Sequence, residues 1–538
     1  MKVKEEKVAI SDDTGESTDV GKIPVEPLPI ESPLRRLARK IWGRMHWVFP
    51  NALHSPGMDE TRYLQKQERE SNEASRVPEG EELRLSLVWG MELFGPAEVE
   101  QLYEKLARLR WSAGFARSKA GGALDWVRHQ RAYGGDGGWY NVGAVAEHGN
   151  GQRFMMLSNY ASLPVEVDYL LVRIFQSTPS LTCVLVGFVL KERGANNYQI
   201  ELSRDRRTVR ERSKHRWFIS ILDPAHLKKR SIEQARSKIQ DMVGRWFGTN
   251  LPGFFCGLSS GRVPTAELIT TRTSRLFSDE RDEPRSTLSG WRRLLANDSP
   301  FDVWTSAECP GLQFSTGEHG STDEPFHLVV SLCESDVPED TLKHLGGREH
   351  GSYAAYCHEM LDGILSNYAG LAFLREVSKD LKVSRGELKL SRLSHRGGVH
   401  VLERIQSFFD RSLGTPAVAT ELRDRSKHLS LYQHECSNFV SSMWGENDGR
   451  REIANVLRER THFLATRVVA EEHSTREHFE QLSSILSVRE SVRAQHRMEL
   501  LTIVALVAAI CSLLVALPPM KDWPSHIQSH LESIRPDR

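Results

Sequence analysis

The sequence predicts an α+β cytosolic domain, then an all-α stalk built as a long antiparallel helical hairpin, and one C-terminal transmembrane helix. Three observations support this prediction. Strand-like and helix-like segments alternate irregularly over residues 80–350, which is typical of α+β proteins. Residues 450–517 contain neither Gly nor Pro in 68 positions, which favours a near-continuous helix. Residues 500–517 form an uncharged run of 18, and such a helix is about 27 Å long, close to the thickness of a bilayer core.

Composition excludes several classes of protein. The chain of 538 residues is too long for one ordinary core. Its 71 Lys and Arg balance 71 Asp and Glu, so no global charge attracts nucleic acid, although a local basic segment leaves nucleic acid open as a partner. The hydrophobic content of 39% argues against several membrane spans, and seven scattered cysteines without a Cys-x-x-Cys pair indicate reduced, cytosolic thiols. No cofactor is predicted.

The flanks of the apolar run predict its orientation. The run begins at Leu500 and ends at Leu517, where Pro518 and Pro519 stop the helix. Three arginines precede it closely, whereas Lys521 is the one cation in the ten residues after it, and the N-terminus carries no signal peptide. We therefore expect a single-pass protein in the lipid bilayer, with a cytosolic N-terminus and a short outer tail over residues 518–538.

Small residues within the run predict self-association. Ala505 and Ala509 lie four positions apart, as do Ala508 and Ser512, and this spacing permits close approach of two helices. We expect a homodimer or a higher homo-oligomer. Pairing within one chain is the alternative, because the stalk offers apolar stripes of its own.

The N-terminal 79 residues divide into three segments. Residues 1–33 are polar and rich in Pro, which predicts disorder, and residues 51–79 resemble a linker. Between them, residues 34–50 form a basic amphipathic helix that suits anionic lipid headgroups, or alternatively docks on the protein's own α+β domain. Its polar face and its interfacial aromatic residues are Arg35, Arg36, Arg39, Lys40, Arg44, Trp42 and Trp47.

Periodicity predicts the elements of the α+β domain, which spans residues 80–350 and has two lobes in one interpretation. Alternating Leu83, Leu85 and Leu87 predict a strand over residues 82–93, and an amphipathic helix follows over residues 96–110. Further strands are predicted over residues 154–158, 184–191, 197–202, 217–222 and 327–333, with a helix over residues 231–247.

Residues 351–499 are predicted to form the helical stalk. Helices are expected over residues 352–385, 399–412 and 417–444, and the last of these has a heptad spacing of apolar residues. Folding it against the helix that begins near residue 450 produces the antiparallel hairpin. The stalk then carries the α+β domain above the membrane.

A basic segment in the α+β domain predicts contact with phosphate groups. Seven cations stand against two acids within residues 204–216, and they suit anionic lipid headgroups or nucleic acid. A solvated connection between two strands is the alternative interpretation. The cations are Arg204, Arg206, Arg207, Arg210, Arg212, Lys214 and Arg216.

Two short motifs raise the question of catalysis. Residues 257–261 match Gly-x-Ser-x-Gly, in which Ser259 would be the nucleophile of a hydrolase, but Pro264 obstructs the helix that should follow. His358 and Glu359 resemble the start of a zinc-protease helix, but Asp362 stands in place of the second histidine. A Gly/Ser turn and an amphipathic helix explain these residues more simply, so no metal site and no catalytic residue are predicted.

An α/β domain on a helical stalk that enters the bilayer resembles the CorA family of magnesium transporters. That family has two membrane helices joined by a Gly-Met-Asn loop, whereas Leu517 is followed here by Pro-Pro-Met-Lys. No residue or function is carried over from the resemblance. The sequence thus predicts a membrane-anchored recognition or sensor protein without evident catalytic activity, with a tethered hydrolase or a degenerate transport-related protein as alternatives.

Overall fold

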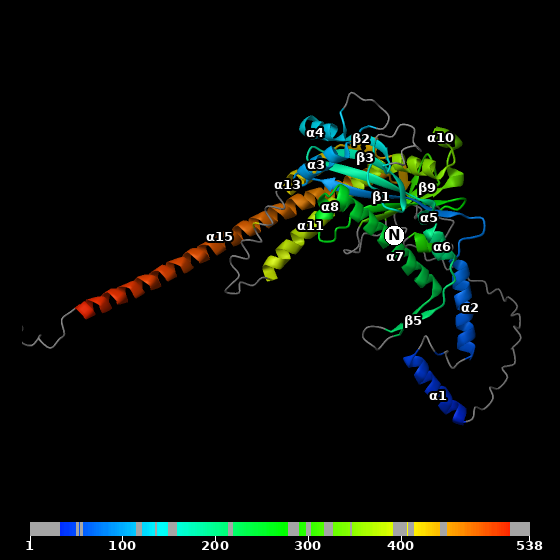
Figure 1. The fold of residues 1–538 in the computed structure, drawn as a ribbon, viewed down its shortest axis with the longest axis horizontal. Helices are drawn as coiled ribbons and strands as arrows, with labels where there is room; N and C mark the ends of the chain where they lie inside the picture. The colour runs from blue at the N-terminus through cyan, green and yellow to red at the C-terminus, as the bar shows by residue number, and fades with distance from the viewer. Residues whose placement is uncertain are drawn as a thin grey trace, which may run out of the picture. The chain divides into compact units, whose positions relative to one another are not determined.

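The computed structural model describes residues 33–49, 53, 58–113, 121–134, 137–148, 159–212, 219–277, 290–296, 303–316, 326–344, 347–390, 406, 414–441 and 449–516 (Figure 1). The chain divides into two compact units. Unit 1 comprises residues 1–69 and 208–222, and unit 2 comprises residues 70–207 and 223–538. The predicted disordered end before Pro33, the strand over residues 154–158 and the outer tail lie outside the described residues.

A mixed sheet of nine strands forms the core of unit 2, in the order β11-β8-β9-β10-β7-β1-β4-β3-β2. All neighbouring strands run antiparallel except β7 and β10, which are parallel. The mixed α/β class is therefore confirmed. The strands are β1 (Leu83–Phe94), β2 (Gly138–Val145), β3 (Val167–Thr178), β4 (Leu181–Leu190), β7 (Thr265–Thr271), β8 (Val303–Ser306), β9 (Leu312–Ser315), β10 (His327–Cys333) and β11 (Phe439–Ser441).

The central strand β1 is covered on both faces. Its side chains alternate between the two faces, as in any strand. Trp89 donates a hydrogen bond from Nε1 to Nδ1 of His358 on helix α11 (His350–Leu390), at 3.1 Å. The next residue, Gly90, faces helix α7 (Pro224–Asn250), and a Cβ atom there would overlap the side chain of Val243. Two covered faces explain why the second half of β1 is almost entirely apolar.

Shorter helices surround the sheet and its connections. Unit 2 contains α3 (Val99–Leu109), α4 (Ala123–Tyr133), α5 (Glu192–Ala195), α6 (Asn197–Ser203), α8 (Phe254–Gly257), α9 (Gly290–Leu295), α10 (Glu339–His344), α13 (Thr415–Arg425) and α14 (Leu429–Glu435). The predicted strand over residues 197–202 is wrong, because these residues form α6. Tyr198 and Leu202 are buried one helical turn apart. Because they are four residues apart, they would also lie on the same face of a strand, so a segment this short fits both patterns.

The predicted single helix over residues 417–444 is also wrong. The chain forms α13 and α14 and then turns at Ser437 into the edge strand β11, which pairs with β8. Phe439 packs on Phe314 with ring centroids 5.1 Å apart, so this apolar residue is buried by the sheet and not by a partner helix. The hairpin stalk is consequently not confirmed, and residues 351–441 contribute to the same compact unit as the sheet.

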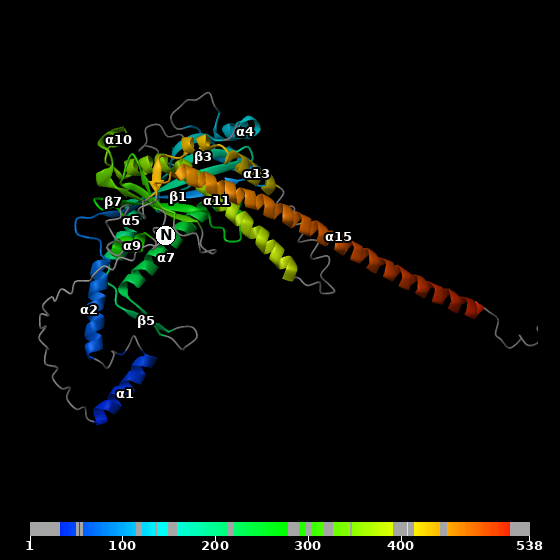
Figure 2. The same ribbon diagram turned by 180° about the vertical axis from the view of Figure 1, so that it is seen from behind.

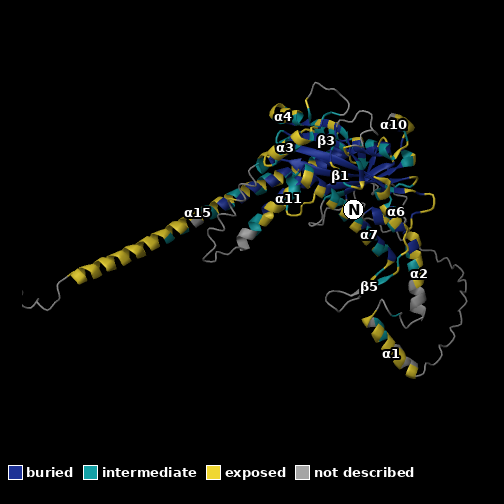
Figure 3. Ribbon diagram, in the orientation of Figure 1, coloured by how far each residue is buried: buried dark blue, intermediate teal, exposed yellow. Residues whose placement is uncertain are grey.

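Helix α15 (Ile453–Ala516) is the longest element, and 64 residues make it about 96 Å long. Its first part packs on α11, α13 and α14 (Figures 1 and 2). The apolar stripe of this part includes Leu457, Val468 and Phe479, all of which are buried. Beyond Phe479 no described residue of α15 is buried, and residues 494–516 are all exposed (Figure 3).

Unit 1 contains the basic amphipathic segment as helix α1 (Pro33–Val48), the start of α2 (Met58–Ala74) and a hairpin of β5 (Val209–Arg212) and β6 (Ile219–Leu222). Pro33 occupies the first position of α1, where its missing N–H costs no helical hydrogen bond. The hairpin connects to α2 through the backbone N–H of Thr208, which donates to Oε1 of Glu68 at 2.9 Å.

Close approach of α14 to α11 requires glycine at position 363. A Cβ atom at Gly363 would overlap the carbonyl oxygen of Glu435, and a backbone oxygen cannot rotate away as a side chain can. We predict that Gly363→Ala lowers the free energy of unfolding by about 1–3 kcal/mol in a urea titration.

Gly370 on the same helix is the matched control, because no atom lies within 4 Å of a Cβ atom there. Gly370→Ala should stabilise the protein by up to about 1 kcal/mol, as Ala does in most helix interiors. Equal effects of the two substitutions would contradict the proposed contact.

Candidate functional site

The exposed end of α15 is the most distinctive surface of the chain. Residues 500–516, which start at Leu500 and include Ala505 and Ala509, are all exposed and carry no charge. Within the described part of the chain, α15 is the one helix long and apolar enough to cross a membrane. Leu517, the predicted last residue of the span, lies outside the described residues.

The predicted basic patch is divided by the structure. Arg204 and Arg206 belong to unit 2 and both pair with Glu201, at 3.3 Å and 2.5 Å. Arg210 and Arg212 lie on β5 of unit 1, while Lys214 and Arg216 lie outside the described residues. Arg204 and Arg206 are therefore partly neutralised, Arg207 belongs to unit 2 with them, and the other four cations belong to unit 1.

Lys228, which follows the hairpin in sequence, does not extend the patch. Lys228 on α7 is buried, and its Nζ donates to Oγ of Ser75 at 2.9 Å and to the carbonyl oxygen of Leu202 at 2.6 Å. Burial lowers the pKa of Lys228 to about 8. This lysine thus ties α7 to α2 and α6 inside unit 2.

His358 and its neighbours on α11 do not form a zinc site. His358 is buried and binds Trp89, and burial, with a contribution from Arg173, lowers its pKa to about 3, so the imidazole is neutral. Asp362, one turn on, is paired with Arg173 of β3, and Glu359 is exposed. Among the described residues no three His, Cys, Asp or Glu side chains are grouped to hold a metal ion.

A cavity of about 370 Å³ opens beside this ion pair. Its walls come from β2, β3, α11, α14 and the turn after β8, and they combine aromatic with charged side chains. The ring of Trp139 lies 5.6 Å from that of His434, centroid to centroid. The walls carry Glu308, Glu359, Asp362 and Glu435 against Arg173 and His434, so acidic groups predominate.

A buried polar network forms the floor next to this cavity. The guanidinium of Arg425 pairs with Glu435 and donates to Oδ1 of Asn367 at 2.9 Å. Asn367 in turn donates to Glu435 at 2.9 Å and to the carbonyl oxygen of Gly363 at 2.8 Å. A buried charge needs such partners, so the network holds α13 and α14 on α11. Sequence reasoning missed it, because its members come from three separate helices.

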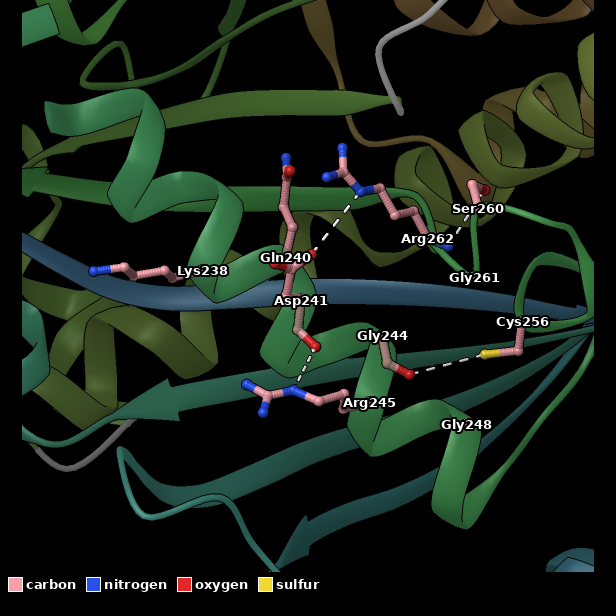
Figure 4. A pocket seen from close by; sticks show the side chains of 10 residues that line it. All are labelled: Lys238, Gln240, Asp241, Gly244, Arg245, Gly248, Cys256, Ser260, Gly261 and Arg262. Atoms are coloured by element: carbon pink, nitrogen blue, oxygen red, sulfur yellow. Dashed lines mark hydrogen bonds and ion pairs between the residues drawn. The ribbon is translucent and has the colours of Figure 1, made fainter. Parts of the chain in front are cut away.

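The Gly-x-Ser-x-Gly motif lies on an exposed turn. Helix α8 precedes Ser259 and strand β7 follows it, whereas a hydrolase elbow needs a strand before the serine and a helix after it. The adjacent pocket of about 630 Å³ is lined by the turn residues Cys256, Ser260 and Arg262 and by α7 (Figure 4). Arg262 faces Asp241 at 3.9 Å, and the described residues that line this pocket include no histidine. The lining described therefore lacks the histidine that would activate Ser259 in a hydrolase triad.

Glu92 of β1 holds this turn in place from inside the core. Its carboxylate accepts backbone hydrogen bonds from Phe255 at 2.7 Å and from Cys256 at 3.0 Å, which caps the start of α8. Burial raises the pKa of Glu92 to about 7, although these hydrogen bonds act in the opposite direction. The carboxyl group is therefore a structural support of the turn.

Comparison with known proteins provides no relative for this chain: no family model, curated protein or solved structure matches it.

Glu92 should make stability depend on pH. Between the usual pKa of 4.5 and about 7, the unfolded chain ionises this group while the folded protein keeps it protonated, so stability falls as pH rises. Across this pH range the free energy of unfolding should fall by about 3 kcal/mol in total. We predict that Glu92→Gln removes this component in urea titrations from acidic to mildly alkaline pH.

At each pH, the free energy of unfolding of the Glu92→Gln variant is subtracted from that of the wild-type protein. Groups that titrate in the same way in both proteins cancel in this difference. His358 is the relevant case, because its lowered pKa gives a component that rises with pH in both proteins. Parallel pH profiles for the two proteins would show that Glu92 is already ionised in the fold.

Proposed function

We propose that the chain is a single-pass membrane protein whose α/β unit faces the cytosol and recognises a ligand or partner there. The observation that carries the proposal is the continuity of α15. Its first part packs in the core of unit 2, and the same helix ends in 17 exposed, uncharged residues, 500–516. Exposure of these apolar side chains to water is unfavourable, whereas the hydrocarbon core of a bilayer accommodates them.

Charge and cysteine content support the cytosolic orientation. Arg489, Arg493 and Arg497 precede the apolar residues on α15, which matches the excess of cations on the cytosolic side of membrane helices. Six cysteines lie in the described part of unit 2 before the apolar residues, and all of them are free thiols. Free thiols suit a reducing compartment.

Recognition is assigned to unit 2, beside the anchor. The cavity of about 370 Å³ is within the size range of small-ligand sites and includes a partly exposed Trp139. One of its walls is α14, which packs on α15. A ligand in the cavity would therefore lie one helix away from the element that enters the membrane.

The anchor can be tested with pairs of arginine substitutions. Val507→Arg with Ile510→Arg places two cations near the centre of the span, at a cost of about 5–7 kcal/mol on insertion scales. We predict that wild-type protein stays in the membrane fraction after high-salt and alkaline washes, whereas this variant is released.

Val488→Arg with Val492→Arg is the matched control. Both valines are exposed on the same helix, at 61% and 48%, but lie before the span. This variant should remain in the membrane fraction. Release of wild-type protein by salt, or equal behaviour of the two variants, would contradict the anchor.

We also propose self-association through the small residues of the span. Ala505 and Ala509 lie one turn apart on an exposed helix and leave room for a second backbone. Chemical crosslinking in detergent should yield dimers or larger species, and Ala505→Ile with Ala509→Ile should reduce their yield several-fold. Monomer at every protein concentration would contradict the proposal.

A further inference from the structure

Helix α1 presents an exposed apolar face. Leu37, Ile41, Met45 and Val48 are 57%, 53%, 48% and 49% exposed. At about 100° per residue, they lie together with Leu34 within an arc of about 80° on the helix. Half-exposed side chains of this size on one face indicate a surface that another apolar phase covers.

The rest of the helix circumference is cationic. Residues 33–49 contain five Lys and Arg and no Asp or Glu. By the same angular count four of these five positions lie about 60° or more outside the apolar arc, whereas Arg44 borders the arc next to Leu37. Apolar and cationic halves of one helix match the two layers of a membrane surface, where acyl chains lie below charged headgroups.

A second cationic segment belongs to the same unit. Residues 208–222, which form the β5–β6 hairpin, contain four Lys and Arg against Glu211 alone. The hairpin also exposes Ile221, at 58%. Two segments far apart in the sequence thus combine the same features, cations and an exposed apolar residue, in unit 1.

We propose that unit 1 binds the surface of a bilayer that contains anionic phospholipids, with α1 lying in the headgroup layer. Cations alone would suit the phosphates of nucleic acid equally well. The apolar arc of α1 favours lipid, because it gains nothing on a phosphate backbone but inserts between headgroups. This binding does not depend on the span of α15, since all its residues belong to unit 1.

The test is hydrogen exchange of residues 33–49 in the full chain. The chain is mixed with vesicles of phosphatidylcholine alone, or of phosphatidylcholine with phosphatidylserine. We expect exchange in α1 to slow about tenfold with the anionic vesicles only, and high salt to reverse the effect. Exchange of β1 in the same samples reports whether unit 2 stays folded.

Charge variants show whether the cations of α1 itself are required, or whether any positive charge on the chain is enough to bind anionic vesicles. Arg36→Gln, Arg39→Gln and Lys40→Gln together should abolish the protection of α1. Removal of three exposed cations from unit 2 is the matched control and should leave the protection unchanged; these are Lys343→Gln, Arg348→Gln and Lys427→Gln.

Three outcomes would overturn the proposal. Protection that is already present without vesicles would mean that α1 docks on the protein itself, and equal protection by both kinds of vesicle would mean that α1 does not recognise anionic headgroups. Protection by RNA in lipid-free buffer, without protection by anionic vesicles, would assign unit 1 to nucleic acid. Failure of the anchor is seen separately, because a chain without a span would be washed from vesicles by salt and still show the lipid-dependent protection at low salt.

Discussion

The packing of α11 between the sheet and α15 is the contact on which the architecture of unit 2 depends. One side of α11 lies on β1, β3 and β4, and the other side lies on α15. A helix covered on both sides is buried around its circumference, and residues 361–374 of α11 are accordingly all buried. The polar members Asp362 and Asn367 are paired with Arg173 and Glu435. Through α11, the position of α15 relative to the sheet is determined by side-chain packing and not by a flexible connection.

Buried polar groups specify how the helices dock on this core. Arg425, Glu435 and Asn367 satisfy one another where α13 and α14 meet α11. On the other side of the sheet, burial would raise the pKa of Glu267, but Arg236 at 2.6 Å and further partners lower it to about 2. If one of these helices shifted, the partners would separate and a charge would remain buried without a partner, which is energetically costly.

Local sequence patterns predicted the long and strongly periodic elements. The strand over residues 327–333 coincides with β10, and the predicted helix over residues 231–247 lies within α7. The absence of Gly and Pro after residue 450 correctly indicated α15, since nothing in that stretch interrupts a helix. These elements needed no knowledge of their partners.

Tertiary contacts decided the elements that the sequence did not predict. The heptad spacing around Tyr432, Cys436 and Phe439 reflects real burial, but against α11, α15 and the sheet edge, so the same pattern forms two short helices and a strand. The cavity beside Trp139 has no local signature either, because segments far apart in the sequence supply its walls. Periodicity reports that a residue is buried and not which element buries it.

The two membrane contacts proposed for the chain differ in strength for a simple quantitative reason. Residues 500–516 contain ten Leu, Ile and Val side chains, and removing each from water gains about 1.5–3 kcal/mol, or about 15–30 kcal/mol in all. Helix α1 has five cations that gain about 1 kcal/mol each and a few apolar side chains that enter only the headgroup layer. Gly43 costs α1 about 1 kcal/mol of helix stability before binding. Anchoring by α15 would therefore be permanent, whereas contact through unit 1 would depend on lipid charge and salt. The lipid composition of the membrane could then regulate the contact of unit 1 while α15 stays inserted.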